Sequence, residues 1–172
     1  MEAVSELLAE RGLEGLTIAA VCERAGVQVG SFYHQFSSKE EAVLGAVRAA
    51  IEAVDPDPDH VGADTVAGLT QAYVAFVTGE PHLARVYLRL GVVGGLGRGP
   101  FGEEFLTHHR RRVERFGDAM LREHGLEEKE AAARAELMLA ALNGLAVGWL
   151  LDPTIDLVGL ADRALAVAGA GP

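Results

Sequence analysis

Helical spacing of the apolar residues is the feature that most constrains the fold of this chain. Apolar side chains recur at intervals of three and four residues along most of the 172 residues, which is the period of an amphipathic α-helix. Alanine and leucine, both strong helix formers, are abundant, and no alternating β-branched run bounded by turns predicts a strand. We therefore expect an all-α fold whose helices are separated by glycine and proline.

Glycine, proline and capping residues divide the chain into about nine predicted helices. The expected ranges are 1–11, 18–25, 28–35, 38–54, 64–78, 81–93, 101–124, 127–151 and 155–168. Gly12 is expected to end the first helix, and Ser38 with Glu41 predicts a capping box at the fourth. The glycine-rich stretch 91–100 is predicted to be a flexible loop.

The segment Asp55-Pro56-Asp57-Pro58-Asp59 is predicted to be a linker. Its two prolines exclude a helix, and its carboxylates are expected to stay solvated. The linker separates the first 54 residues from the rest of the chain.

Charge and cysteine content limit the classes of partner. The net charge of −10 argues against nucleic-acid binding through bulk charge, so any DNA contact must come from a local surface. Residues 1–54 carry eight glutamates against three arginines and one lysine, a net charge of −4, so non-specific DNA affinity should be weak and strongly salt-dependent.

Cys22 is the sole cysteine, which excludes an intramolecular disulfide. It is expected to be a buried packing residue. The chain shows no signal peptide after Met1, and the apolar stretch 137–151 is short for a membrane span. We expect a soluble protein of the reducing cytoplasm. No Glu-x-x-His pair suggests a carboxylate-bridged metal site, so neither a metal nor another cofactor is expected.

The most informative stretch is TIAAVCERAGVQVGSFYHQFSSKEEAV, which begins at Thr17. Its two short predicted helices meet at Gly26, where glycine permits the tight turn of a unit whose second helix can enter the major groove. The predicted miniature core comprises Ile18, Val21, Val27, Phe32 and Phe36. The residues left on or near the outer face are Gln28, Val29, Ser31, Tyr33 and His34.

The polar side chains of this outer face can donate to phosphate oxygens or to base edges, and Gly30 lets the backbone come close. Lys39 stands at the start of the next helix, where free N–H groups and the helix dipole favour a phosphate. A small helical subdomain without a DNA role is the alternative interpretation.

This stretch resembles the DNA-binding module of the tetracycline-repressor (TetR) family. The matching pieces are Thr17, Ala20, Ala25-Gly26-Val27, Gly30, Ser31, Tyr33, Phe36 and Lys39. The resemblance is strong over about the first 50 residues and only architectural beyond them. It implies a helix-turn-helix DNA-binding domain, expected at residues 1–47, and a helical ligand-binding and dimerisation domain, expected at residues 48–172.

The resemblance also implies a homodimer that binds a near-palindromic operator, represses transcription and is released by a small-molecule effector. It implies that Thr17, Tyr33 and Lys39 hold phosphates. The residues implied to face bases or backbone are Gln28, Val29, Ser31 and His34. The family usually carries a longer, often basic segment ahead of the first helix, so we expect either a missing arm or a truncated start.

The apolar faces of the helices predicted after the linker could enclose an aromatic-walled cavity, the usual form of a small-molecule site. The candidate ligand-binding residues are Tyr73, Phe76, Tyr87, Phe105, His109, Arg112, Phe116, Met120 and Asn143. The alternative is a packed core in which Glu103, Glu104 or Asp118 satisfies His109 and Arg112. The run 108–112 is predicted to be a solvated charged face, because consecutive helical residues point in different directions.

The stretch 137–151 has Asn143 as its one polar residue, and a helix that is apolar all round must be covered on all sides. An isologous four-helix interface with a second copy is the favoured cover, and a central position within one subunit is the alternative. The candidate interface residues are Ala140, Gly144, Gly148, Trp149, Leu157, Leu160 and Leu165. Asn143 is expected to bond either across this interface or into the cavity.

A ligand-responsive transcription regulator, acting as a repressor, is the leading hypothesis. The second is a helical small-molecule-binding module that has lost DNA binding, which the acidic first 54 residues favour. An enzyme is disfavoured, because the sequence shows no nucleophile–base pair and no phosphate-binding loop.

Overall fold

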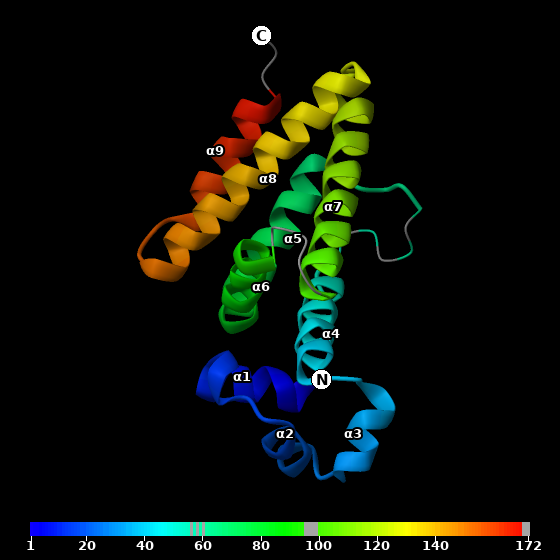
Figure 1. The fold of residues 1–172 in the computed structure, drawn as a ribbon. Coiled ribbons are helices and arrows are strands. Elements are labelled where there is room, and N and C mark those ends of the chain that lie inside the picture. Colours follow the sequence, from blue (N-terminus) through cyan, green and yellow to red (C-terminus); the bar gives the residue numbers. More distant parts are fainter. Residues whose placement is uncertain (56, 58, 60, 95–99, 170–172) are drawn as a thin grey trace.

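The computed structural model describes residues 1–172 except residues 56, 58, 60, 95–99 and 170–172 (Figure 1). All regular structure in this described part is helical, which confirms the predicted all-α class. The helices are α1 Glu2–Gly15, α2 Ile18–Ala25, α3 Val29–Gln35, α4 Lys39–Glu52, α5 Val66–Gly79, α6 Pro81–Gly94, α7 Pro100–His124, α8 Glu128–Leu151 and α9 Leu157–Gly169.

Two predicted boundaries are wrong. Gly12 does not end α1: it adopts φ 66° and ψ −179°, which kinks the helix, and helical residues resume as far as Gly15. The predicted flexible loop at 91–100 is wrong for residues 91–94, which lie in α6, and for Pro100, which begins α7. Residues 95–99 of that predicted loop lie outside the described residues.

The predicted capping box at the start of α4 is present with one change of partner. The Ser38 hydroxyl oxygen accepts the N–H of Glu41 at 3.1 Å, as an N-cap should. The Glu41 carboxylate reaches Ser37 instead of Ser38 and accepts both its N–H and its hydroxyl at 2.6 Å. These hydrogen bonds from Ser37 lower the pKa of Glu41. The start of α4, directly after α3, is therefore firmly fixed.

The helices form two parts joined by α4 (Figure 1). The unit α1–α3 lies at one end of the molecule, and α4 runs from it into the larger part formed by α5–α9. Both α1 and α4 pack against α6, and at this junction Arg89 of α6 donates to Glu14 of α1 at 2.8 Å. The helix α4 passes without interruption through the predicted domain boundary between residues 47 and 48.

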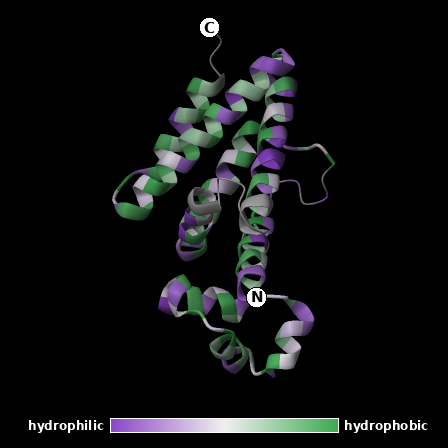
Figure 2. Cartoon of the chain, viewed as in Figure 1, coloured by the Kyte–Doolittle hydropathy of each residue, from purple (hydrophilic) through white to green (hydrophobic). Residues whose placement is uncertain are grey.

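A continuous hydrophobic core runs through both parts. In the smaller part its most buried side chains include Leu7, Leu8 and Phe32, and in the larger part they include Phe116 and Leu139. Cys22 is buried in the same core, as predicted. Apolar residues also extend over α8 and α9 (Figure 2). Because the core is shared between the parts, a movement of α4 or α6 can be transmitted to α1–α3.

Both ends of the segment between α4 and α5 are bound to α7. Arg115 of α7 binds both Asp55 and Asp64, which flank the segment between α4 and α5. Asp57 is buried, and its carboxylate accepts the backbone N–H groups of residues 61–63 at 2.8–3.1 Å. The expectation that these carboxylates stay solvated is wrong for Asp55 and Asp57, because a cation and backbone donors replace their water.

The helix α8 is, by length and composition alone, apolar enough to cross a membrane. The core helix of a soluble protein passes the same test, and α8 packs along α7 on one side and α9 on another. Its apolar character is therefore explained in part by the helices that cover it.

Candidate DNA-binding surface and ligand cavity

A left-handed turn orients α3 relative to α2. Gly26 adopts φ 66° and ψ 30°, a conformation that favours glycine, and its N–H donates to the Glu23 carbonyl at 3.3 Å. The N–H of Val27 donates to the Cys22 carbonyl at 3.0 Å. These two bonds close the end of α2 in the manner of a Schellman motif, and the chain then starts α3. The result is the predicted helix-turn-helix.

Phe32 anchors α3 from behind. Its ring is 4% exposed and packs edge-on against Tyr33 at 5.6 Å and tilted against Phe36 at 5.5 Å. Ile18 and Phe36 are half-buried around it. The predicted core position of Val27 is wrong: its side chain is 44% exposed, because it lies in the turn where its backbone caps α2.

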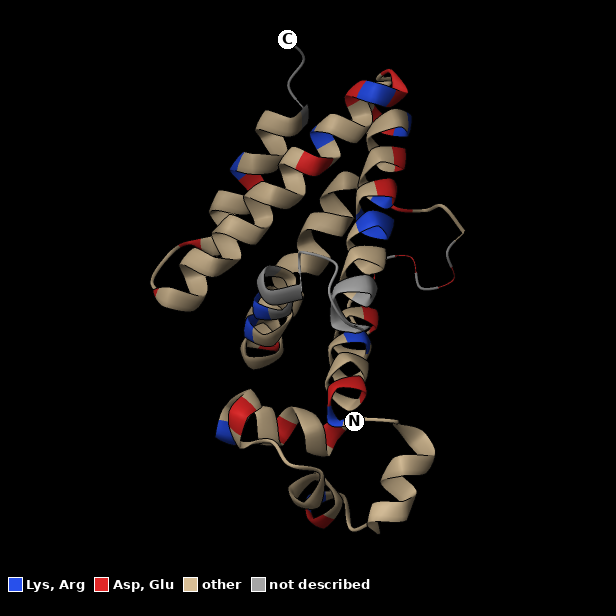
Figure 3. Cartoon of the chain, in the orientation of Figure 1, with Lys and Arg blue, Asp and Glu red and all other residues tan. Residues whose placement is uncertain are grey.

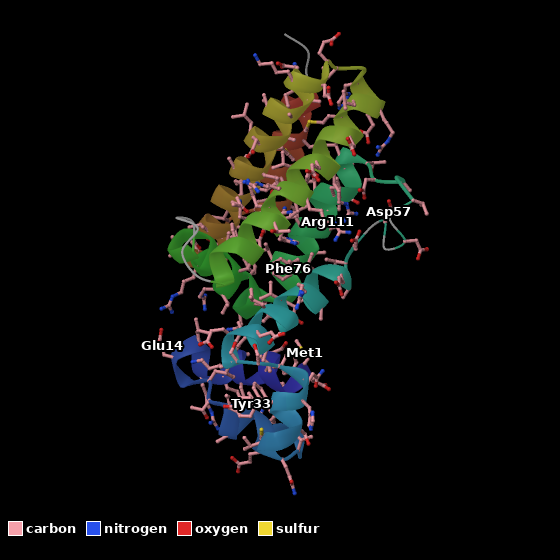
Figure 4. All side chains as sticks on the ribbon, turned by 45° about the vertical axis from the view of Figure 1, so that its right-hand side comes forward. Met1, Glu14, Tyr33, Asp57, Phe76 and Arg111 are labelled. Carbon is pink, nitrogen blue, oxygen red and sulfur yellow. The ribbon has the colours of Figure 1, made fainter. Side chains whose placement is uncertain are left out.

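The outer face of α3 is free of its own chain. Tyr33 is 56% exposed, and Gln28, Val29, Gly30, Ser31 and His34 are all exposed as predicted. The helix contains no Lys, Arg, Asp or Glu, so its face offers amide, hydroxyl, phenol and imidazole groups (Figure 3). Figure 4 shows Tyr33 in the small part of the molecule, far from Phe76 in the larger part.

Two helix starts flank α3. Thr17 is the exposed N-cap of α2 and accepts the N–H of Ala20 at 3.1 Å, which leaves its hydroxyl hydrogen available. Lys39 is the first residue of α4 and is half-buried. Free N–H groups and the positive end of the helix dipole make such positions suited to a phosphate.

The acidic residues of the first 54 lie on helices other than α3 (Figure 3). Arg24 of α2 donates to Glu6 at 2.8 Å and to Glu10 at 2.7 Å, both on α1. The hydrogen bond from Arg24 lowers the pKa of Glu10. Arg24 therefore links α2 to α1 and pairs with two of the carboxylates. The exposed face of α3 stays neutral.

The larger part contains a cavity of about 390 Å³ between α4, α5, α6 and α7. Its lining consists of Arg48, Ile51, Glu52, Val54, Asp55, Leu69, Ala72, Tyr73, Phe76, Tyr87, His108, Arg111, Arg112, Arg115 and Phe116. Five of these are predicted ligand-binding residues, namely Tyr73, Phe76, Tyr87, Arg112 and Phe116. Phe76 and Arg111 lie close together in the middle of this part (Figure 4).

Four predicted ligand-binding residues do not line the cavity. Met120 is buried in the core, and Phe105 packs at a tilt against Tyr87 with ring centroids 5.0 Å apart. His109 lies parallel to Phe105, and its Nε2 is 3.3 Å from the Glu136 carboxylate of α8. The acidic partner of His109 among the described residues therefore comes from a neighbouring helix, whereas the side chains of the predicted partners Glu103 and Glu104 lie outside the described residues.

Asn143 bonds toward the cavity wall. Its Oδ1 accepts the Tyr73 hydroxyl at 2.9 Å, and Tyr73 lines the cavity, which is one of the two predicted directions. Burial raises the pKa of Tyr73, although Arg112 opposes the shift. The phenol therefore stays protonated and remains a donor to Asn143.

Arg112 lies over an aromatic wall. Its guanidinium carbon is 4.6 Å from the centroid of the Tyr73 ring, and its Nη1 donates to the Tyr87 hydroxyl at 3.3 Å. Within the described residues, no carboxylate lies at ion-pair distance from Arg112. This guanidinium is held by π-electrons and a neutral hydroxyl alone.

His108 is the buried polar group that sequence reasoning missed. In the described part of the chain its buried Nε2 has no hydrogen-bond partner, and its ring meets Tyr87 edge-on at 5.7 Å. Burial, followed by the nearby Arg112 and Arg111, lowers the pKa of His108 to about 4. The prediction of a solvated face at 108–112 is wrong for His108 and Arg112, which are half-buried, and correct for the exposed Arg110 and Arg111.

Arg115 joins the cavity wall to the end of α4. Its guanidinium binds Asp55 at 2.6 and 2.8 Å and Asp64 at 2.6 and 2.7 Å. The two hydrogen-bonded carboxylates raise the pKa of Arg115 still further above its ordinary value. Sequence reasoning could not find this cluster, because its members lie 51 and 60 positions apart.

Large apolar side chains lie exposed along α8 and α9. Leu137 and Leu151 of α8 are 71% and 81% exposed, and Val147 between them is also exposed. Of the predicted interface residues, Ala140 and Gly144 are exposed and Gly148, Trp149, Leu160 and Leu165 are half-buried. Leu157 is 2% exposed and covered by its own chain, so it does not belong to this open surface.

The fold and the exposed α3 define a class of protein: an all-helical chain with an N-terminal helix-turn-helix and a cavity-bearing helical body. Residues 1–45 match the family described as bacterial regulatory proteins, tetR family. The N-terminal part of this chain therefore matches the tetR family, which confirms the resemblance found from the sequence.

The curated relatives match the same segment. Over 52 residues the chain is 38% identical to the HTH-type transcriptional repressor KstR2 of Mycobacterium tuberculosis and 36% identical to that of Rhodococcus jostii. The match covers 30% of this chain and 26% of each relative, so it spans about a quarter of the relatives' length.

Solved structures match over the whole chain in fold alone. A transcriptional regulator from Rhodococcus sp. Rha1 superposes with a TM-score of 0.74 at 24% identity, over 99% of this chain and 96% of that one. The fatty acid degradation regulator FadR of Bacillus halodurans gives 0.72 at 14% identity, over the same shares. FadR of Bacillus subtilis, solved with stearoyl-CoA, gives 0.63 at 18%, again over 99% and 96%.

Proposed function

We propose that this protein is a ligand-responsive transcription regulator that acts as a repressor. It binds a near-palindromic operator as a homodimer and leaves the operator when a small-molecule effector fills the cavity. The observation that carries the proposal is the uncharged, uncovered face of α3 on a domain that matches the tetR family. Regulators of this family generally act by binding, and the proposal assigns the chain no reaction.

The reading of DNA is assigned to α3 and the two helix starts beside it. With α3 in the major groove, Gln28, Ser31 and His34 face base edges or backbone, and Gly30 and Val29 permit close approach. Neutral amides, hydroxyls and imidazoles recognise bases through hydrogen bonds, which needs no positive charge on the helix itself.

The phosphate contacts are assigned to Thr17, Tyr33 and Lys39. Thr17 and Lys39 stand at the positive ends of α2 and α4, and the exposed Tyr33 hydroxyl is free to donate. A domain with so few cations should hold DNA weakly at high salt. The proposed role in transcription places the protein in the cytoplasm, where the operator is.

The exposed apolar surface of α8 and α9 is assigned to the homodimer. A two-fold axis through this surface would pack α8 and α9 of two copies into a four-helix interface. The two α3 helices would then need to lie about 34–36 Å apart to enter successive major grooves.

The effector is assigned to the cavity because α4 forms one of its walls. Arg48, Ile51 and Glu52 of α4 line the cavity, and α4 leads directly into the α1–α3 unit. A ligand that binds more tightly to one position of α4 relative to α7 shifts the population toward that position. The distance between the two α3 helices of the dimer then changes. FadR of Bacillus subtilis, which shares the fold, was solved with stearoyl-CoA, in keeping with ligand binding in such a body.

Selection from a random pool of DNA duplexes tests the proposal without knowledge of the operator. The purified full chain at low salt should enrich a short inverted repeat. The variant Tyr33→Ala, which loses a proposed phosphate contact, should enrich the same repeat more weakly, whereas Gln71→Ala, an exposed change on α5, should behave as the wild type. A wild-type protein that is folded and enriches nothing would favour the alternative, a ligand-binding module that has lost DNA binding.

A further inference from the structure

The α7 wall of the cavity gathers nitrogen donors on one helix face. His108 lies three and four residues before Arg111 and Arg112, and Arg115 lies four and three residues after them, so the four fall on one side of α7. All four line the cavity. The α5 and α6 residues of the lining include the aromatic rings of Tyr73, Phe76 and Tyr87, so the cavity combines basic groups from α7 with aromatic rings from α5 and α6.

Arg112 is the member of this row whose charge lacks an anionic partner. Arg115 is matched by Asp55 and Asp64, whereas the hydrogen bond of Arg112 within the described residues goes to the Tyr87 hydroxyl at 3.3 Å. A guanidinium carries five N–H donors, so most of those on Arg112 are unused. A half-buried charge without a counter-ion is costly, and an anion from solution would relieve that cost.

His108 supplies a second unsatisfied group one helical turn away. Its Nε2 is buried and has no hydrogen-bond partner in the described part of the chain. Buried polar atoms almost always have partners, so an unpaired one on a cavity wall points to a partner that comes from outside. A neutral imidazole with its proton on Nε2 can donate to an anionic oxygen beside the arginine.

The acidic side chains at the cavity do not cancel this basic wall. The Asp55 carboxylate is bound by Arg115 through two hydrogen bonds, and Glu52 is exposed at the last turn of α4. The aromatic part of the lining comes from Tyr73, Phe76 and Tyr87 of α5 and α6, which suit an apolar or aromatic body. The volume of about 390 Å³ is in the range of small-molecule sites.

We infer that the cavity binds an organic carboxylate: Arg112 and His108 hold the carboxylate, and an aromatic or aliphatic body lies against Tyr73, Phe76 and Tyr87. This names the chemical class of the effector, and only its regulatory role rests on the proposed function. Binding of the carboxylate itself is a property of the cavity and can be measured without DNA.

Three probes with the same body separate charge from shape: 4-phenylbutyrate, 4-phenylbutan-1-ol and 4-phenylbutylamine. Each is titrated into the purified full chain by isothermal calorimetry. We expect the carboxylate to bind about tenfold more tightly than the alcohol, since hydrogen bonds to charged groups are the stronger ones, and the amine to bind weakest. This ranking is obtained on the wild-type protein and needs no variant to fold.

Variants test whether Arg112 and His108 cause the preference for the carboxylate probe. Arg112→Met should bring the carboxylate and the alcohol to nearly equal affinity, and His108→Phe should weaken the carboxylate alone. Arg110→Met is the matched control, because Arg110 is exposed on the same helix and does not line the cavity. It should leave the ranking of the three probes unchanged.

The inference is overturned if the alcohol binds as well as the carboxylate, if the amine binds best, or if no probe binds at millimolar concentration. Release of DNA separates it from the proposed function. A carboxylate that binds as expected without releasing DNA leaves the site standing and removes the effector role. A neutral probe that releases DNA with no preference for the carboxylate leaves the regulator standing and removes this inference.

Discussion

Arg115 of α7 binds Asp55, three residues beyond the end of α4, through two parallel hydrogen bonds of 2.6 and 2.8 Å. The same guanidinium lines the cavity. The pair therefore joins the helix that carries the DNA-binding unit to the wall where we place the effector. Any ligand that moves Arg115 changes the position of the end of α4.

Removal of Arg115 should destabilise the fold strongly. In Arg115→Met the carboxylates of Asp55 and Asp64, which are 10% and 8% exposed, would lose their counter-ion. Breaking a buried pair from one side costs about 3 kcal/mol. Urea denaturation at neutral pH measures the loss, and the exposed Arg110→Met should change stability by less than about 0.5 kcal/mol. Equal stabilities of the two variants would show that the cluster is not a structural tie.

Stability should fall on acidification because of His108. An unfolded histidine takes up its proton near pH 6.5, whereas burial and the neighbouring arginines lower the pKa of folded His108 to about 4. Between these values the unfolded state binds more protons, so stability is full above about pH 6.5 and declines as the pH falls toward about 4. The decline due to this residue should be on the order of 2 kcal/mol.

Urea denaturation of His108→Gln at a series of pH values checks this dependence. The variant should decline less than the wild type over the same interval, while the exposed His82→Gln should follow the wild type. Parallel curves for all three proteins would mean that His108 is not kept neutral by the fold.

The N-cap of α4 should be worth about 1 kcal/mol. Ser38→Ala removes the oxygen that accepts the N–H of Glu41, and the loss of such a cap costs about 1 kcal/mol. Ser38→Asp keeps an acceptor and should restore most of the stability. Thermal unfolding followed by circular dichroism makes the comparison, and an alanine variant as stable as the aspartate variant would contradict the role of the cap.

A charge on the exposed face of α8 should separate the proposed dimer. Leu137→Glu places a carboxylate on a surface where the native side chain is 71% exposed, so a single chain can tolerate it but a packed interface cannot. Analytical ultracentrifugation should find a dimer for the wild type and a monomer for this variant. Leu106→Glu, on the exposed side of α7, is the control and should remain dimeric. A monomeric wild type would remove the proposed assembly.

Local signals explain why so much of the fold could be predicted. Gly26 and the N-cap Thr17 each act within a few residues, and both behave as the sequence indicates. The error at Gly12 is of a different kind. Its backbone takes a positive φ, but nothing after it prevents another helical turn, so the residue kinks α1 instead of ending it.

The cavity was less predictable because its polar wall depends on the exact facing of α7. Sequence periodicity placed His109 on the apolar stripe, whereas the helix turns His108 toward the cavity and His109 toward Glu136 of α8. The pairing of Arg115 with Asp55 joins residues 60 positions apart, and no local pattern indicates it. Packing between helices decides which of two consecutive residues faces the cavity. It also decides which residues far apart in the sequence come into contact.

The most direct test of whether α3 reads DNA is the affinity of the protein for the selected inverted repeat, measured by fluorescence anisotropy. The double variant Tyr33→Ala with Lys39→Ala should lose roughly 100-fold in affinity, since each lost contact costs about 1–3 kcal/mol. Gln71→Ala should bind as the wild type does, and all three proteins should keep the same helical content. Unchanged affinity in a folded double variant would contradict the central claim.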